Sequence, residues 1–146
     1  MSYHKTYRNP NSPFKRDSEE RRFTASFIVI MGEYYRENNK KDWDIFEIDW
    51  NNFELIREIA KTHNAAVDYA LQSFTEALRE DENDVEAQQL TKWINDGVVG
   101  RCKYYHGTDE EIRKEMLGDY IRDARNSVKG YEIFQLKTLE KKWKTL

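Results

Sequence analysis

The chain has 146 residues, of which 35% are charged and 14% aromatic, and its formal net charge is −3. A chain of this length can bury a sizeable core, and its aromatic content argues against wholesale disorder. It lacks the run of about 20 apolar residues that a membrane helix needs, and its polar N-terminus lacks the hydrophobic segment of a signal peptide. The single Cys102 rules out an internal disulfide, so we expect a cytoplasmic protein that does not bind membranes.

Charge is spread unevenly along the chain. Residues 1–22 carry a net charge of +3, residues 23–100 a net charge of −9, and residues 101–146 a net charge of +3. The basic ends either fold onto the acidic middle of the same or a neighbouring copy, or they hold an anionic partner. Both interpretations stay open at this point.

Residues 1–18 show no periodicity, and Pro10 and Pro13 predict a turn or an extended arm. We therefore predict a basic arm at residues 1–18 and a single helical domain at residues 19–146. The candidate partner-binding residues of this end alternate cations with rings: Tyr3, Lys5, Tyr7, Arg8, Phe14, Lys15, Arg16, Arg21 and Arg22. Such a set suits an acidic protein groove with the rings as anchors, single-stranded nucleic acid or RNA, or the chain's own acidic middle.

Apolar residues at helical spacing predict the first helices of the domain. The first covers residues 19–38, although the β-branched run Ile28-Val29-Ile30 is also compatible with a strand. Two further helices cover residues 52–63 and 65–79, with a break at Asn64 between them.

The next segments include one more helix and two ambiguous stretches. Residues 84–95 predict a helix, whereas residues 42–50 and 98–105 each fit a short strand or an irregular connection. The predicted fold is mainly α, a compact orthogonal bundle of five to six helices. It includes a small two-stranded ribbon if the two ambiguous stretches pair.

Residues 108–130 have the sharpest helix boundaries in the sequence. Thr108 and Glu111 match a capping box, and Gly130 is placed as a left-handed stop. Gly118 lies inside this helix, where glycine costs about 1 kcal/mol against alanine, so we expect it to let another backbone approach.

Residues 131–146 predict an amphipathic basic helix. The residues expected to face the core are Ile133, Leu136, Leu139, Trp143 and Leu146. Lys137, Lys141 and Lys144 form a row beside that face and are further candidate partner-binding residues.

Two short patterns resemble small all-α hydrolases. Acidic residues recur every four positions at Glu111, Glu115, Asp119 and Asp123. The part from Glu115 to Asp119 resembles an acidic helix of the MazG-type nucleotide pyrophosphohydrolases, which implies a divalent cation on nucleotide phosphates. Met116 stands where that family has a second glutamate, and an earlier helix lacks the matching acidic pair. The alternative is a solvated helix edge.

Arg57 and His63 are similar in spacing to the arginine–histidine pair of HEPN-type ribonucleases. That resemblance implies a pair at a helix end that cleaves RNA in a dimer. The simpler interpretation is a surface arginine and a histidine that complements the C-terminal end of a helix dipole.

The residues favour a small non-enzymatic binding protein, an adaptor or inhibitor that acts by protein–protein contact with the basic arm as a clamp. A nucleic-acid-binding accessory protein and a small hydrolase of either resembled type are the alternatives. The expected partner is a protein, within a complex that handles RNA or DNA, and homo-oligomers are compatible with the charge pattern. We expect no metal and no cofactor, because one cysteine and three histidines without helical spacing do not form a metal site.

Overall fold

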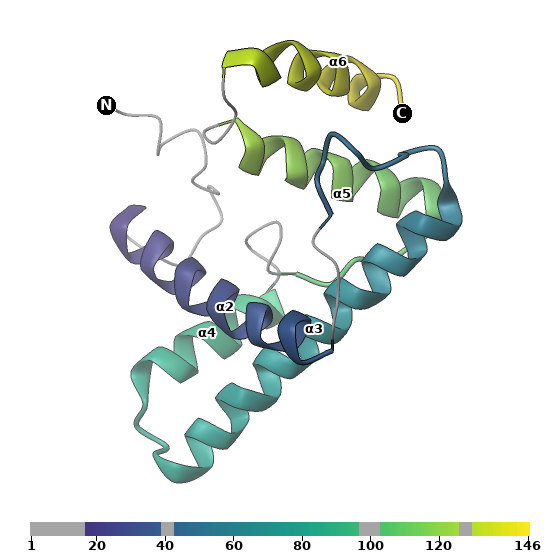
Figure 1. The fold of residues 1–146 in the computed structure, drawn as a ribbon. Helices are drawn as coiled ribbons and strands as arrows, with labels where there is room; N and C mark the ends of the chain where they lie inside the picture. The colour runs from purple at the N-terminus through teal and green to yellow at the C-terminus, as the bar shows by residue number, and fades with distance from the viewer. Residues whose placement is uncertain (1–16, 39–42, 97–102, 126–129) are drawn as a thin grey trace. The chain divides into compact units, whose positions relative to one another are not determined.

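The computed structural model describes residues 17–38, 43–96, 103–125 and 130–146 (Figure 1). Its elements are α2 (Asp17–Glu37), α3 (Phe53–Glu80), α4 (Val85–Asp96), α5 (Asp109–Ala124), the 3-10 turn η2 (Gly130–Glu132) and α6 (Ile133–Lys144). The prediction of a mainly α fold is confirmed. No strand occurs in the described ranges, so no ribbon is seen there, and residues 98–102 of the second ambiguous stretch lie outside them. None of the described helices combines the length and the apolar character needed to cross a bilayer.

Contacts divide the chain into two compact units. Unit 1 is formed by the described residues of 1–41 and 62–104, and unit 2 by those of 42–61 and 105–146. Helix α3 contributes its first turns to unit 2 and the rest of its length to unit 1. The single domain and the orthogonal bundle expected from the sequence stay predictions.

Unit 1 has a core of aliphatic and small side chains. Its buried residues come from α2, α3 and α4: Phe27, Met31, Ala66, Val67, Ala70, Phe74, Ala87, Leu90 and Ile94. The rings of Phe27 and Phe74 lie 6.5 Å apart between centroids. Alanine on the inner face of α3 takes little space, which lets neighbouring helices pack closely on it.

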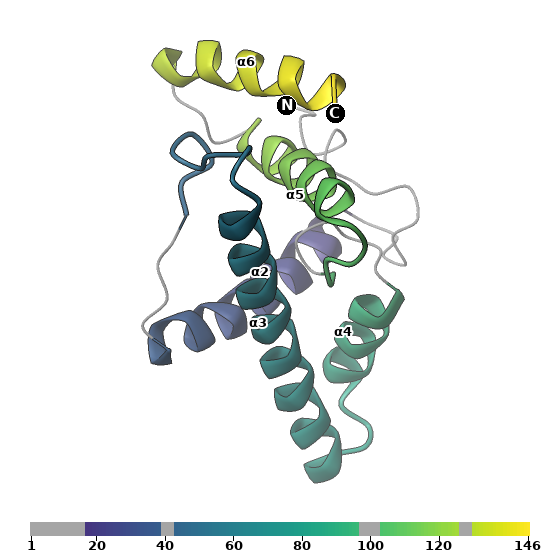
Figure 2. The same ribbon diagram turned by 90° about the vertical axis from the view of Figure 1, so that its right-hand side faces the viewer.

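The predicted break at Asn64 is wrong, because α3 runs without interruption from Phe53 to Glu80 (Figure 2). Asn64 is a weak helix former, but it costs less than about 0.7 kcal/mol in a helix interior. The apolar positions before and after it, such as Ile59 and Val67, belong to one continuous helical register and are buried. Tertiary packing on both sides therefore outweighs the local preference.

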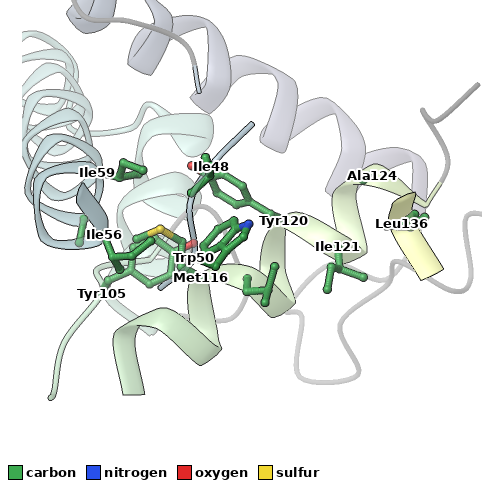
Figure 3. Packing of buried hydrophobic residues seen from close by; sticks show 12 residues of the cluster. Ile48, Trp50, Ile56, Ile59, Tyr105, Met116, Tyr120, Ile121, Ala124 and Leu136 are labelled. Carbon is green, nitrogen blue, oxygen red and sulfur yellow. The ribbon is translucent and has the colours of Figure 1, made fainter. Parts of the chain in front are cut away.

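Unit 2 has a core rich in aromatic and aliphatic side chains, most of which Figure 3 labels. They come from the segment before α3, the start of α3, α5 and α6, with Tyr105 just before α5. Trp50 is only 1% exposed, and its ring meets that of Tyr120 edge to face at 5.7 Å. Its indole Nε1–H donates to the carbonyl of Ile45 at 3.2 Å, so the large ring is buried with its polar group satisfied.

Residues 43–52 form turns, which decides between the two interpretations of the first ambiguous stretch. Asp44 accepts a hydrogen bond from the amide of Phe46, and Asp49 accepts one from the amide of Asn51. Such aspartate turns offer the backbone an alternative to strand pairing. Asn52 then caps α3 by accepting from the amide of Leu55 at 3.2 Å.

Helix α5 begins as predicted and ends earlier than predicted. The Thr108 hydroxyl accepts from the amide of Glu111, and the Glu111 carboxylate accepts from the amide of Thr108, both at 3.3 Å. The helix stops at Ala124 with Arg125 as its C-terminal cap, and Gly130 opens the 3-10 turn η2 without a positive φ. The left-handed stop predicted at Gly130 is therefore wrong. Residues 126–129, which belong to the predicted extension, lie outside the described ranges.

Candidate binding surface on helix α6

Helix α6 is held against α5 by a set of contacts near its C-terminal end (Figures 1 and 2). The indole Nε1–H of Trp143 donates to the carbonyl of Lys114 at 2.8 Å. The Lys114 ammonium donates to the carbonyl of Leu146 at 2.9 Å and lies 5.6 Å from the centre of the Trp143 ring. Leu136 is buried in the unit 2 core. These contacts fix which face of α6 points away from α5.

Gly118 makes the close contact between the two helices possible. A Cβ atom at this position would lie 2.8 Å from Nε1 of Trp143, a distance that real Cβ atoms do not show. The prediction that Gly118 admits a close neighbour therefore holds, but the neighbour is an indole ring and not a backbone. Beside this contact, the Nε of Arg125 lies 3.7 Å from a carboxylate oxygen of Glu140.

The inward face of α6 is narrower than the sequence predicts. Leu136 is buried, and Leu139 and Leu146 are half-buried. Ile133 is 44% exposed and Trp143 is 36% exposed, so the expectation that both face the core is wrong for Ile133 and only partly right for Trp143. The described contacts of α6 come from α5, from η2 and from the turn at Phe46, which leaves much of the helix circumference uncovered.

The outward face of α6 carries an aromatic ring among lysines. Phe134 is 80% exposed. Lys137, Lys141 and Lys144 are exposed as well and follow Phe134 by three, seven and ten residues, a spacing that keeps all four on one side of a helix. Among the described residues, Phe134 is the most exposed of the large hydrophobic side chains.

An open hollow of about 280 Å³ borders Phe134. Its lining consists of Phe46, Phe134, Gln135, Thr138 and Leu139. The Thr138 hydroxyl donates to the carbonyl of Phe134 at 3.1 Å, so this polar group is already bonded within the helix. We call Phe134, the three lysines and this hollow the α6 surface. It offers an apolar depression and a row of cations to the same ligand.

Phe134 is not among the partner-binding residues predicted from the sequence, whereas the lysine row is, and the structure shows these lysines to be exposed. The inward residues of α6 were identified by their apolar character, and Phe134 falls outside their arc. Its spacing from Lys137 and Lys141 was the available signal, because an aromatic residue in register with a polar row must be exposed.

The remaining predicted partner-binding residues lie near the N-terminus of the chain. Tyr3, Lys5, Tyr7, Arg8, Phe14, Lys15 and Arg16 lie outside the described residues. Arg21 and Arg22 belong to the first turns of α2, where only the backbone course is described. Their role in binding stays a prediction.

The acidic row on α5 is not one solvated edge. Glu111 is engaged in the capping box, whereas Asp119 is only 4% exposed. Asp119 accepts a hydrogen bond from the Tyr105 hydroxyl at 3.2 Å and lies 3.5 Å from the Arg122 guanidinium. Within the ranges that the structure describes, no three His, Cys, Asp or Glu side chains come together in a way that could hold a metal ion.

Arg57 and His63 have separate structural partners. The Nε of Arg57 donates to the carbonyl of Phe53 at 3.3 Å and lies 3.7 Å from a carboxylate oxygen of Asp109. His63 is 4% exposed, and its Nε2 lies 2.8 Å from the carbonyl oxygen of Lys103. Helix α3 continues well beyond His63, so the helix-end position implied by the ribonuclease resemblance is not found.

Two tyrosines of unit 1 have raised pKa values. The Tyr104 hydroxyl donates to a carboxylate oxygen of Asp68 at 2.7 Å. Burial, together with this hydrogen bond and the nearby negative charge, raises the pKa of Tyr104 to about 12. Burial also raises the pKa of Tyr69, and the charges of Glu37 and Glu33 add to this shift. In both cases burial is the largest cause, and neighbouring carboxylates add to it.

No protein-family model, no curated protein and no solved structure matches this chain.

Proposed function

We propose that the protein is a non-enzymatic binding protein that captures an acidic partner protein through the α6 surface. The basic arm is the second contact of this proposal and acts as a clamp. Action of this kind is steric, as in an adaptor or an inhibitor that covers part of a larger assembly.

The observation that carries the proposal is the 80% exposure of Phe134 beside three exposed lysines on a helix that α5 holds in place. Burying a phenylalanine side chain contributes about 1.5–3 kcal/mol, which is the size of an interface anchor. Lysines around such an anchor add orientation and faster association with an acidic surface rather than much affinity. The Trp143 and Lys114 contacts already hold α6 in place. The helix therefore loses less conformational freedom when a partner binds.

Nucleic acid is the second candidate partner, because an exposed ring among lysines also suits a stacked base between phosphates. The hollow between Phe46 and Leu139 favours a protein, since it fits an inserted apolar side chain better than a phosphate backbone.

The test compares proteins captured from an extract of the native host by two forms of the full chain. One form is the natural sequence, and the other carries Phe134→Ala and Lys141→Glu. A control carries Val29→Ala and Lys61→Glu, which remove an exposed apolar group and an exposed cation elsewhere. The proposal predicts a protein that the natural and control chains retain after nuclease treatment and that the α6 variant loses.

Two results would contradict the proposal. Equal capture by the α6 variant would show that the α6 surface takes no part. Loss of all captured material on nuclease treatment would favour the nucleic-acid candidate.

A further inference from the structure

Unit 1 contains an open groove between α2, α3 and α4 with a volume of about 270 Å³. Ile30, Phe74 and Leu90 supply its larger apolar side chains, while Ala77 and Ala87 keep space open between them. The groove therefore has room for an apolar side chain from another molecule.

The polar groups of the groove are bonded at its edges. The Ser26 hydroxyl donates to a carboxylate oxygen of Glu86 at 3.2 Å, and Asp84 accepts from the amide of Ala87 at 3.1 Å. The Ser73 hydroxyl donates to the carbonyl of Tyr69 at 3.1 Å. A ligand that enters the groove therefore contacts an apolar floor, and the serine hydroxyls at its edges already donate to groups of the protein.

The groove is also negatively charged. Asp84 and Glu86 line it, and the lining residues that the structure describes include no lysine or arginine. The exposed residues Glu80, Asp81 and Glu82 come just before it in the chain. An occupant that combines an apolar side chain with neighbouring cations would match both properties.

We propose that the occupant is the α6 surface of a second copy of this chain, with Phe134 in the groove and Lys137 and Lys141 facing Asp84 and Glu86. The two surfaces have opposite charge, and each combines an apolar centre with a charged border. The distribution of net charge, −9 for residues 23–100 and +3 for residues 101–146, agrees with this pairing. The inference rests on the proposed function in that it uses the α6 surface as a protein-binding face.

The contact joins unlike surfaces of two copies, so it closes a dimer when it is reciprocal and continues into longer chains when it is not. In either case the groove and an acidic partner protein compete for the same α6 surface. Self-association then limits how much of the protein is available to that partner.

The first experiment measures the mass of the natural chain in solution against concentration and salt. We expect species larger than the monomer, with weaker association at high salt because charge pairs contribute. A monomer at every concentration, or association that is insensitive to salt, would overturn the inference.

The second experiment uses two variants whose defects complement each other. One carries Glu86→Lys in the groove, and the other carries Phe134→Ala and Lys137→Glu on α6. Each alone is expected to associate at least about tenfold more weakly, whereas their mixture forms a heterodimer from one intact groove and one intact α6 surface. The matched control Glu76→Lys makes the same charge change at an exposed residue of unit 1 outside the groove and leaves association unchanged.

The mixture of the two variants shows whether the copies associate through the groove and the α6 surface or through other surfaces. A heterodimer supports the pairing, and its absence overturns it, provided circular dichroism shows that both variants are folded. A fluorescein-labelled acidic peptide with one leucine separates this inference from the proposed function. Glu86→Lys keeps the affinity for that peptide, and the α6 variant loses it. Equal peptide binding by both variants would contradict the proposed function alone.

Discussion

The two units achieve burial in different ways. Unit 1 packs helices through small and aliphatic side chains, with Ala66 and Ala70 on the inner face of α3. Unit 2 packs large rings, and two of them have a polar partner: Trp50 bonds to the carbonyl of Ile45, and Tyr105 to the carboxylate of Asp119.

This difference shows where sequence periodicity is a sufficient guide. Interlocking small residues need only a regular helical pattern, so the helical segments of unit 1 follow from the spacing of apolar residues, although the continuity of α3 at Asn64 does not. Buried rings with hydrogen-bonding groups need particular partners that are distant in the sequence, and spacing does not reveal them. The outward surfaces differ too, since unit 1 presents an acidic groove and unit 2 a basic helix.

The largest expected effect is that of Trp50→Ala. Removing a fully buried indole from the unit 2 core should lower the free energy of unfolding by about 3–5 kcal/mol. Hydrogen exchange followed by mass spectrometry should show loss of protection in α5 and α6, with α4 protected. Equal loss of protection in α4 would mean that the two cores do not unfold as separate units.

A pair of glycine substitutions sharpens the comparison, because each unit has one glycine inside a helix that the structure describes. Gly32→Ala in α2 meets no atom within 4 Å and should stabilise by about 1 kcal/mol. Gly118→Ala should destabilise by about 1–3 kcal/mol, since the added carbon displaces Trp143 from its hydrogen bond. Urea unfolding measures both. A stabilising effect of Gly118→Ala would show that α6 is not packed as described.

Removal of helix caps should have a smaller effect. Thr108→Ala removes the hydroxyl that accepts from the amide of Glu111 and donates to its carboxylate, and it should cost about 1 kcal/mol. Asp84→Ala removes the single hydrogen bond that this side chain makes to the amide of Ala87, and it should cost less. Thermal unfolding of both variants gives the ranking, and a larger cost for Asp84→Ala would reverse it.

The last effect concerns pH and is confined to strongly alkaline solution. The pKa of Tyr104 is about 12 in the folded protein and about 10 in an unfolded chain, so folding favours the protonated hydroxyl. This contribution is complete below pH 10 and is lost as pH rises from about 10 to about 12. The ultraviolet absorbance of tyrosinate should show a group that ionises near pH 12 and that Tyr104→Phe removes. Unchanged late ionisation in that variant would assign the shift to another tyrosine.

Local signals in the sequence determined part of the fold and of the candidate site. The Thr108 capping box, the cap at Asn52 and the exposed lysine row of α6 all depend on residues within a few positions of each other. The continuous α3 at Asn64, the turns before Trp50 and the burial of Asp119 depend on packing between distant segments. Phe134 combines both situations. Its helical register places it with the exposed lysines, whereas its apolar character is typical of a core residue.

Site-specific photocrosslinking from position 134 tests the central claim most directly. A photoreactive phenylalanine analogue replaces Phe134 in the full chain, and the same analogue at Val29, which is 63% exposed on α2, serves as the control. In the native host, the account predicts a discrete protein adduct from position 134 and none of that mass from position 29. Identical adducts from both positions, or adducts with nucleic acid alone, would contradict it.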